Sequence, residues 1–298
     1  MAVLATNRKR RAESFNLQDS KKRRFSSPEN PLSSFNATMS TRSPTECREF
    51  LRFKSLVSYE PFLRLKEDER AQVKHAFSRR NRTNVLVSHK DSNLDIHGTN
   101  LRCLRPTTYL NDEVINLYLE LLKERQTRDP QKYLKCHFFN TFFYIKLVGN
   151  SGSTYDYKAV RRWTTKRKLG YDLTDCDIIF VPIHGGDHWT LAVINMKERK
   201  FLYLDSLNEA DTTKILNALA KYLVDEVMDK NGKDIDVRSW GCEFVKNLPR
   251  QHNGYDCGMF MLKYIDFYSR GLSLDFSQKD MPYFRLRTAK EILGLRAD

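Results

Sequence analysis

The spacing of apolar positions along the chain predicts several amphipathic helices. After Asn111, apolar residues recur every three or four positions, which is typical of a helix with one buried face. Asn111 suits the N-cap of this helix, and Asp112 and Glu113 would complement its dipole. Its apolar stripe comprises Val114, Ile115, Leu117, Tyr118, Leu121 and Leu122. We expect further helices over 62–79, with the acidic run 67–69 toward its middle, and over 157–167 and 210–229.

Short apolar runs bounded by turn residues predict strands between these helices. The clearest is Asp177 to Ile183, a β-branched and aromatic run that is typical of a buried strand. Further strands are expected over 84–87, 189–195, 200–205 and 242–246. The resulting mixture of helices with a largely antiparallel sheet predicts an α+β fold.

The most strongly apolar helix is predicted to start at Cys257. Residues Met259 to Tyr268 are apolar nearly all round, so this helix should be central and buried, and Gly271 stands where a C-cap is expected. A thiol at the start of a helix lies beside unpaired N–H groups and the positive end of the dipole, which favour the thiolate. Cys257 is therefore a candidate nucleophile. The alternative is a small buried hydrophobe, the usual role of an intracellular cysteine.

Gln251 precedes the cysteine by six positions in the segment Gln-His-Asn-Gly-Tyr-Asp-Cys-Gly. A turn at Asn253-Gly254 would fold its side-chain amide back toward the sulfur. A carbonyl attacked by Cys257 would then develop negative charge near Gln251 and the N–H groups of the helix start, which together would form an oxyanion hole.

A predicted hairpin supplies a base for this thiol. The strands 189–195 and 200–205 pair about a turn, and a turn near Met196-Lys197 places His188 opposite Asp205. Directly opposite residues have Cβ atoms about 4.5–5.5 Å apart, close enough for the carboxylate to hold the imidazole. The local charges suit a turn one residue later equally well, which leaves the register open by one step. Alternatively, His188 is a satisfied surface histidine and Asp205 ends a strand.

These three residues together predict a Cys–His–Asp triad. His188 would take the thiol proton and return it to the leaving amine, while Asp205 fixes the tautomer and stabilises the imidazolium. The chain order is His, Asp, Gln, Cys, which differs from that of papain-like enzymes, but triads are recognised by roles and not by order.

Several motifs resemble those of a known family, the SUMO-specific cysteine proteases, also called sentrin-specific or ubiquitin-like-protein proteases. The catalytic boxes of that family are similar to Val181 through Trp189, Tyr203 through Leu207 and Gln251 through Gly258. Further similarity lies in Tyr109 through Asn116, His137 through Phe143 and Asp280 through Arg285. The resemblance covers roughly residues 58–298.

The resemblance implies a papain-like fold of the adenain type and cleavage after the Gly-Gly tail of SUMO, both in precursors and in conjugates to lysine. It assigns His188, Asp205 and Cys257 to the triad and Gln251 to the oxyanion hole. Trp189 would roof a tunnel that admits only glycine, because a Cβ would clash there; its alternative role is core filling. The resemblance also implies substrate contacts by Tyr109, Asp112 and Gly258. Members of the family usually carry Trp where this chain has Tyr109, which puts the balance of peptide and isopeptide cleavage in doubt.

The first part of the sequence has a different composition. Residues 1–24 contain eight Lys or Arg and two Asp or Glu, a net charge of +6 out of +14 for the whole chain. Residues 25–46 are rich in Ser, Pro, Asn and Thr, which is typical of disorder. We therefore expect a disordered basic tail over 1–57 and a catalytic domain over 58–298. The clusters 8–11 and 21–24 predict a bipartite nuclear-localisation signal, and hence a nuclear import receptor as partner. The alternative is a patch that binds nucleic acid or anionic membrane.

The remaining composition indicates no cofactor. The six cysteines follow a basic, polar leader, so free thiols in a reducing nucleus or cytosol are expected. No Cys-x-x-Cys or His spacing indicates a metal, and no apolar run reaches the roughly 20 residues of a membrane span. The basic cluster Arg161 to Lys168 is expected to be the solvated side of a helix around Trp163. Nothing in the sequence demands more than a monomer.

Three other functions compete with SUMO cleavage. A protease for the related modifier NEDD8 would keep the same fold and triad. An acyltransferase would use the same thiol but depend on acetyl-CoA, and Trp189 with its Gly-Gly slot argues against it. A nucleic-acid-binding protein would act through its basic tail without Cys257.

Overall fold

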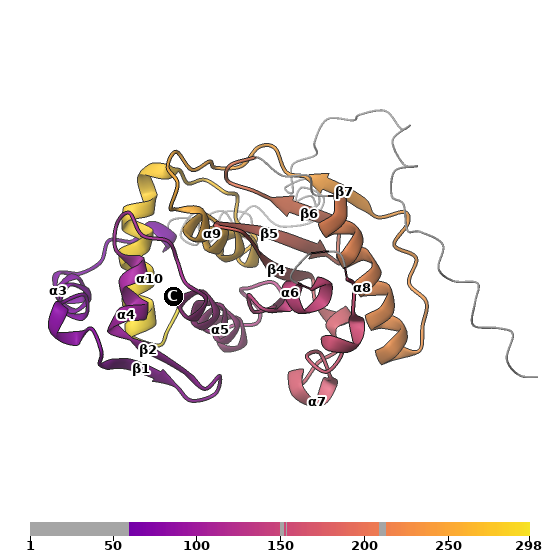
Figure 1. Cartoon of the computed structure of the whole chain (residues 1–298), viewed down its shortest axis with the longest axis horizontal. Coiled ribbons are helices and arrows are strands. Elements are labelled where there is room, and N and C mark those ends of the chain that lie inside the picture. The colour runs from indigo at the N-terminus through magenta and orange to yellow at the C-terminus, as the bar shows by residue number, and fades with distance from the viewer. Residues whose placement is uncertain (1–59, 150–151, 153, 209–212) are drawn as a thin grey trace, which may run out of the picture. The chain divides into compact units, whose positions relative to one another are not determined.

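A computed structural model of the chain describes residues 60–149, 152, 154–208 and 213–298 (Figure 1). The chain divides into a unit that ends at Lys66 and a unit from Glu67 to Asp298. Of the first unit, the described part carries a single short 3-10 helix, η2 (Glu60–Phe62). The predicted basic tail and its nuclear-localisation signal lie outside the described residues, and the boundary predicted at residue 57 stays a prediction. All of the sequence motifs with candidate chemistry lie in the second unit.

The second unit contains both helices and strands (Figure 1). Its α-helices are α3 (Glu67–Ala76), α4 (Gly98–Leu101), α5 (Asp112–Arg128), α6 (Phe143–Val148), α7 (Lys166–Leu169), α8 (Thr213–Asn231), α9 (Cys257–Ser269) and α10 (Met281–Leu293). Its strands are β1 (Val85–His89), β2 (Leu94–His97), β3 (Cys136–Phe138), β4 (Ile178–Gly185), β5 (His188–Asn195), β6 (Lys200–Leu204) and β7 (Gly241–Phe244). Short 3-10 helices are η3 (Arg79–Asn81), η4 (Arg102–Leu104), η5 (Tyr157–Ala159), η6 (Leu173–Asp175) and η7 (Gln278–Asp280).

The central sheet has five strands in the order β3-β4-β5-β6-β7. The pairs at its centre, β4 with β5 and β5 with β6, are antiparallel, whereas β3 and β7 add in parallel at the two edges. Strands β1 and β2 form a separate antiparallel hairpin. The sheet is therefore mixed, and the predicted α+β class is confirmed.

Helix α9 is the centre of the unit, because it contacts the sheet through β5 and β4 and also contacts α5 and α10 (Figure 1). Twelve of its thirteen residues are buried, as its apolar sequence predicts. The charged side chains Lys263 and Asp266 are buried with them, since Asp266 is paired with Lys263 at 3.1 Å, with Arg125 at 2.7 Å and with Arg270 at 2.8 Å. Gly271 follows the helix with a φ of 65°, in the left-handed region that the predicted C-cap requires.

Most predicted elements are present, and two are wrong. Helix α3 begins at Glu67, so the acidic run lies in its first turn, where it complements the dipole, and not toward its middle. The helix predicted over 157–167 is replaced by η5, a turn and the four-residue α7. There Asp156 caps η5 by accepting a hydrogen bond from the N–H of Lys158, but the helical turn ends at Ala159 and a turn follows it. The basic residues of this segment are nevertheless exposed, as expected.

Candidate active site

The hairpin of β5 and β6 positions the predicted base. Its register pairs Leu191 with Leu204 and Asn195 with Lys200, so the turn is centred one residue later than Met196-Lys197. The register that places His188 directly opposite Asp205 is therefore wrong, and the later turn that the sequence left open is right. Moving the turn by one residue shifts the partners by two positions, which keeps both side chains on the same face of the sheet. His188 and Asp205 are accordingly diagonal neighbours.

The two side chains still meet. The Nε2 atom of His188 lies 2.6 Å from Oδ1 of Asp205, and the same oxygen accepts the backbone N–H of Leu207 at 2.9 Å. The Asp205 side chain is completely buried, whereas 24% of the His188 side chain is exposed. A buried carboxylate thus orients a ring that remains accessible from one side.

Cys257 is the first residue of α9 and lies against this ring. Its side chain hydrogen-bonds His188, and the residue is only 1% exposed. Since Nε2 of the imidazole is engaged by Asp205, Nδ1 is the ring atom that remains for the sulfur. Sulfur, imidazole and carboxylate therefore form one continuous chain of hydrogen bonds, as the triad prediction requires.

The surroundings of His188 hold its imidazole in the protonated form. Burial by itself lowers the pKa of the ring, but the hydrogen bonds and negative charges of Asp205 and Cys257 outweigh it and raise the pKa from 6.5 to about 9. At neutral pH the ring is therefore a cation with a proton to give. An imidazole that contacts a thiol can exchange a proton with it, which is the part of a general acid and base.

Gln251 is buried in the loop before α9, and its amide is fixed at both ends. Its Oε1 accepts a hydrogen bond from Ser206 at 2.7 Å, and its Nε2 donates to the carbonyl of Asn253 at 2.7 Å. A carbonyl can only accept, so the nitrogen must face Asn253. The second hydrogen on Nε2 has no partner among the residues that the structure describes. The predicted turn at Asn253-Gly254 is present as a bend, and the assignment of Gln251 to the oxyanion hole stays a prediction.

A buried ion pair anchors the residue that precedes Cys257. Asp256 accepts hydrogen bonds from Asn253, from Gln278 and from Arg285, whose Nη2 lies 2.6 Å from the carboxylate. Arg285 on α10 also donates to the carbonyls of Cys103, Arg105, Thr108 and Tyr255. This Asp256–Arg285 clamp joins the start of α9 to the loop before α5 and to α10. The sequence motifs did not reveal it.

The space next to the nucleophile is narrow. A Cβ placed on Gly258 would lie 2.9 Å from Cβ of Leu110 and 3.2 Å from Cδ1 of Trp189, so position 258 accommodates only glycine. Trp189 is buried, and its indole N–H donates to the carbonyl of Leu110 at 3.2 Å. His184 stacks on the indole with ring centroids 4.1 Å apart. We call Leu110, Trp189 and Gly258 the slot; neither Leu110 nor His184 was singled out from the sequence.

The remaining predicted substrate residues lie near this region. Tyr109 is 52% exposed, and its hydroxyl is 3.8 Å from the place that a Cβ on Gly254 would occupy. Asp112 is the first residue of α5, where Asn111 caps the helix by accepting the N–H of Val114 at 3.0 Å. The predicted contacts of Tyr109 and Asp112 with substrate stay predictions.

The described part of the chain offers little for other kinds of site. There, no group of three His, Cys, Asp or Glu side chains has the arrangement of a metal site. None of the described helices is both long and apolar enough to cross a membrane. Cys103, Cys136, Cys176, Cys242 and Cys257 are free thiols, as expected, and Cys47 lies outside the described residues.

A mixed sheet, a buried helix that starts at a cysteine, and a histidine and aspartate on the adjoining hairpin define a cysteine protease of the papain-like type. Comparison with known proteins gives the same result. Residues 108–297 match the Ulp1 protease family, C-terminal catalytic domain. The chain therefore belongs to the Ulp1 protease family, and the resemblance seen in its motifs is confirmed.

Two curated relatives from Arabidopsis thaliana show how far the similarity extends. The putative ubiquitin-like-specific protease 1B is 73% identical over 247 residues, which cover 82% of this chain and 72% of that protein. The ubiquitin-like-specific protease ESD4 is 70% identical over 242 residues, which cover 81% of this chain and 49% of that protein. The chain thus spans about half the length of the second relative.

A solved structure shares the fold. The C-terminal Ulp1 protease domain in complex with Smt3, the yeast ortholog of SUMO, superimposes with a TM-score of 0.64 and 28% sequence identity. The match covers 78% of this chain and 96% of the solved domain. The matched fold is that of a SUMO protease domain.

Proposed function

We propose that this protein is a SUMO protease that cleaves after the Gly-Gly tail of the modifier, both in SUMO precursors and in conjugates to substrate lysines. The observation that carries the proposal is the hydrogen-bonded chain from Cys257 through His188 to Asp205 at the start of a buried helix. Membership of the Ulp1 family supports it, as do the relatives named for ubiquitin-like modifiers and the solved complex with Smt3.

The geometry supports a two-stage acyl transfer. The Cys257 thiolate attacks the carbonyl carbon of the last glycine, and the carbonyl oxygen becomes negatively charged. This oxygen then accepts hydrogen bonds from the free N–H of Gln251 and from the N–H groups at the helix start. As the C–N bond breaks, His188 gives its proton to the leaving amine, and a thioester remains on the sulfur. The neutral His188 then takes a proton from water as the water oxygen attacks the thioester carbon. The C–S bond breaks, its electron pair returns to the sulfur of Cys257, and the modifier leaves with a free C-terminal carboxylate.

The slot supports the preference for diglycine. Leu110 and Trp189 approach so closely beside Cys257 that even a Cβ on the protein's own Gly258 would clash. A substrate backbone that reaches Cys257 would pass along the outer side of these two side chains, and we expect their bulk to leave little room there for side chains of the substrate. Glycine is the residue that meets this condition.

The decisive experiment measures cleavage of fluorogenic SUMO and NEDD8 substrates. We expect the wild type to turn over SUMO much faster, and Cys257→Ser to lose at least about 10⁴-fold in kcat while still binding SUMO, because the weakly acidic hydroxyl is not activated by an imidazolium. SUMO with an electrophilic C-terminus should attach to Cys257 alone. Full turnover by Cys257→Ser would contradict the mechanism, and faster cleavage of NEDD8 would reassign the modifier.

The remaining parts of the proposal concern the whole protein. We propose that it acts as a monomer in the nucleus, delivered by an import receptor that reads the basic clusters 8–11 and 21–24. A fluorescent fusion should leave the nucleus when both clusters are replaced by alanine. Unchanged nuclear accumulation would refute the signal.

A further inference from the structure

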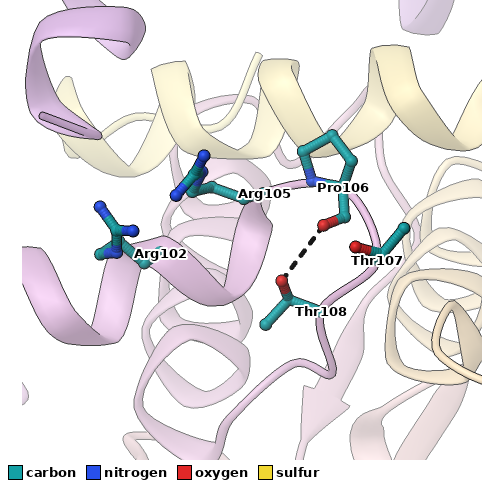
Figure 2. Close-up of a pocket in the computed structure, with 5 residues that line it drawn as sticks. All are labelled: Arg102, Arg105, Pro106, Thr107 and Thr108. Carbon is teal, nitrogen blue, oxygen red and sulfur yellow. Dashed lines mark hydrogen bonds between the residues drawn. The ribbon is translucent and has the colours of Figure 1, made fainter.

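A row of arginines lines two adjoining hollows beside the loop that leads to the slot. One hollow, of about 620 Å³, is lined by Arg79, Arg82, Thr99 and Arg102. The other, of about 590 Å³, is lined by Arg102, Arg105, Pro106, Thr107 and Thr108. Figure 2 shows Arg102 and Arg105 at one side of the second hollow and the two threonines at the other. We call the two hollows together the basic groove; no acidic side chain lines either of them.

The charges of the basic groove are not neutralised within the described part of the chain. Arg79, Arg82 and Arg105 are exposed and form no ion pair there, in contrast to Arg125 and Arg285, which are buried in ion pairs. Arg102 is half-buried, and its Nη1 donates to the carbonyl of Phe77 at 2.9 Å, which fixes the guanidinium without neutralising it. Four guanidinium groups without an ion-pair partner among the described residues, three at the first hollow and two at the second with Arg102 shared, attract carboxylates, which arginine binds in a bidentate geometry.

Arg285 connects the loop that lines the basic groove to the residue next to Cys257. Arg285 donates to the carbonyl of Thr108 at 2.9 Å and to that of Arg105 at 3.1 Å, and the same arginine anchors Asp256 next to the nucleophile. Leu110, a wall of the slot, follows Thr108 by two residues, so their Cα atoms are at most about 7 Å apart. A polypeptide bound at the slot therefore passes close to the groove.

We propose that the basic groove docks an acidic segment of the modifier whose diglycine tail occupies the slot, an inference that rests on the proposed function. The modifier is the same in every reaction, whereas acceptor proteins differ, so a fixed arrangement of arginines suits the modifier. Nucleic acid also carries negative charge, but neither hollow is lined by an aromatic side chain on which a base would stack. A polypeptide rich in Asp and Glu is the occupant that the lining favours.

The test replaces the three exposed arginines and leaves Arg102 unchanged, because Arg102 donates a hydrogen bond to the backbone carbonyl of Phe77. In the variant Arg79→Gln/Arg82→Gln/Arg105→Gln, we expect KM for a fluorogenic SUMO substrate to rise about tenfold, with kcat within twofold of wild type. Raising the salt concentration should lower kcat/KM of the wild type more than kcat/KM of the variant, because the variant has fewer positive charges in the groove to screen. Alkylation of Cys257 by iodoacetamide should proceed at the wild-type rate, which shows an intact site.

The matched control removes three positive charges from an exposed cluster elsewhere, in Arg162→Gln/Arg167→Gln/Lys168→Gln. We expect its KM to equal that of the wild type. Docking at the groove is refuted if the groove variant keeps the wild-type KM, if KM rises equally in both variants, or if kcat and the alkylation rate fall while KM rises. It is also refuted if the groove variant keeps its KM but loses binding to a single-stranded oligonucleotide. Failure of the proposed function would look different, since the wild type itself would then not cleave SUMO.

Discussion

Two histidines of the central sheet show opposite electrostatic behaviour. His137 on β3 is 7% exposed, its Nδ1 lies 2.8 Å from the Tyr171 hydroxyl, and burial, helped by the charge of Lys123, lowers its pKa to about 3. His188 on β5 is also partly buried, yet its pKa is raised to about 9. One ring is neutral at every physiological pH, and the other is a cation.

The two rings differ both in burial and in partners, because His137 is almost fully buried whereas 24% of the His188 side chain is exposed. His137 meets a phenol and the edge of Phe139, with ring centroids 4.4 Å apart, so nothing compensates a positive charge. His188 meets the carboxylate of Asp205 and the sulfur of Cys257, which together outweigh the cost of desolvation. The negative groups beside His188 therefore leave its ring with a proton to donate at neutral pH, whereas His137 has none.

Among the tests of this contrast, the largest effect is expected from making the partners of His188 resemble those of His137. In Asp205→Asn the charge is lost while the shape is kept, so the imidazolium is no longer stabilised and the tautomer is no longer fixed. We expect kcat on SUMO to fall by about 10²–10⁴-fold with a smaller change in KM. Single-turnover acylation is the measurement, and an unchanged rate would show that Asp205 plays no part in the chemistry.

The pH dependence of activity should show a smaller but more specific effect. Because its pKa is raised to about 9, His188 keeps its proton as pH rises through neutrality and loses it only near pH 9. We expect kcat/KM of the wild type to fall about tenfold per pH unit above that point. In Asp205→Asn this alkaline limit should move down toward 6.5, the ordinary value of an imidazole. If the alkaline limit of Asp205→Asn stayed near that of the wild type, the proton donor would be a group other than His188 paired with Asp205.

The raised pKa of His188 also makes the free energy of unfolding depend on pH. The folded state binds the His188 proton more tightly than the unfolded state, so the contribution is complete below about pH 6.5 and is lost as pH rises through about 9. For His137 the sign is reversed. Its pKa is depressed, so its contribution is complete above pH 6.5 and is lost as pH falls toward 3.

The smallest effect on activity is expected for His137→Gln. This ring touches neither Cys257 nor Asp205 in any described contact, so kcat/KM at pH 7.5 should stay within about threefold of wild type. Between about pH 6.5 and 4 the variant should lose less stability than the wild type, since it no longer carries a buried group that must be kept neutral. Urea unfolding at several pH values measures this, and a large loss of activity would show that the contrast between the two histidines is wrong.

The sequence predicted the parts of the site that depend on local structure. The apolar pattern after Cys257 identified the buried helix, and the hairpin brought His188 and Asp205 to one face even though its first register was wrong. Periodicity failed over 157–167, where a short 3-10 helix, a turn and the start of the four-residue α7 take the place of one helix. Contacts between distant segments produce no recognisable pattern in the sequence. Arg285, for example, donates a hydrogen bond to the carbonyl of Cys103, which lies 182 positions earlier in the chain. Such contacts depend on how the elements pack, which a single sequence does not encode locally.

The Asp256–Arg285 clamp also has a consequence in time. A ribosome synthesises Cys257, His188 and Asp205 before it reaches α10, so a nascent chain can carry the whole triad while its guanidinium anchor has yet to be made. Until that arginine emerges and folds back, the loop before α5 and the start of α9 lack the group that joins them. The order of synthesis therefore places the Asp256–Arg285 ion pair among the last contacts of the catalytic domain to form.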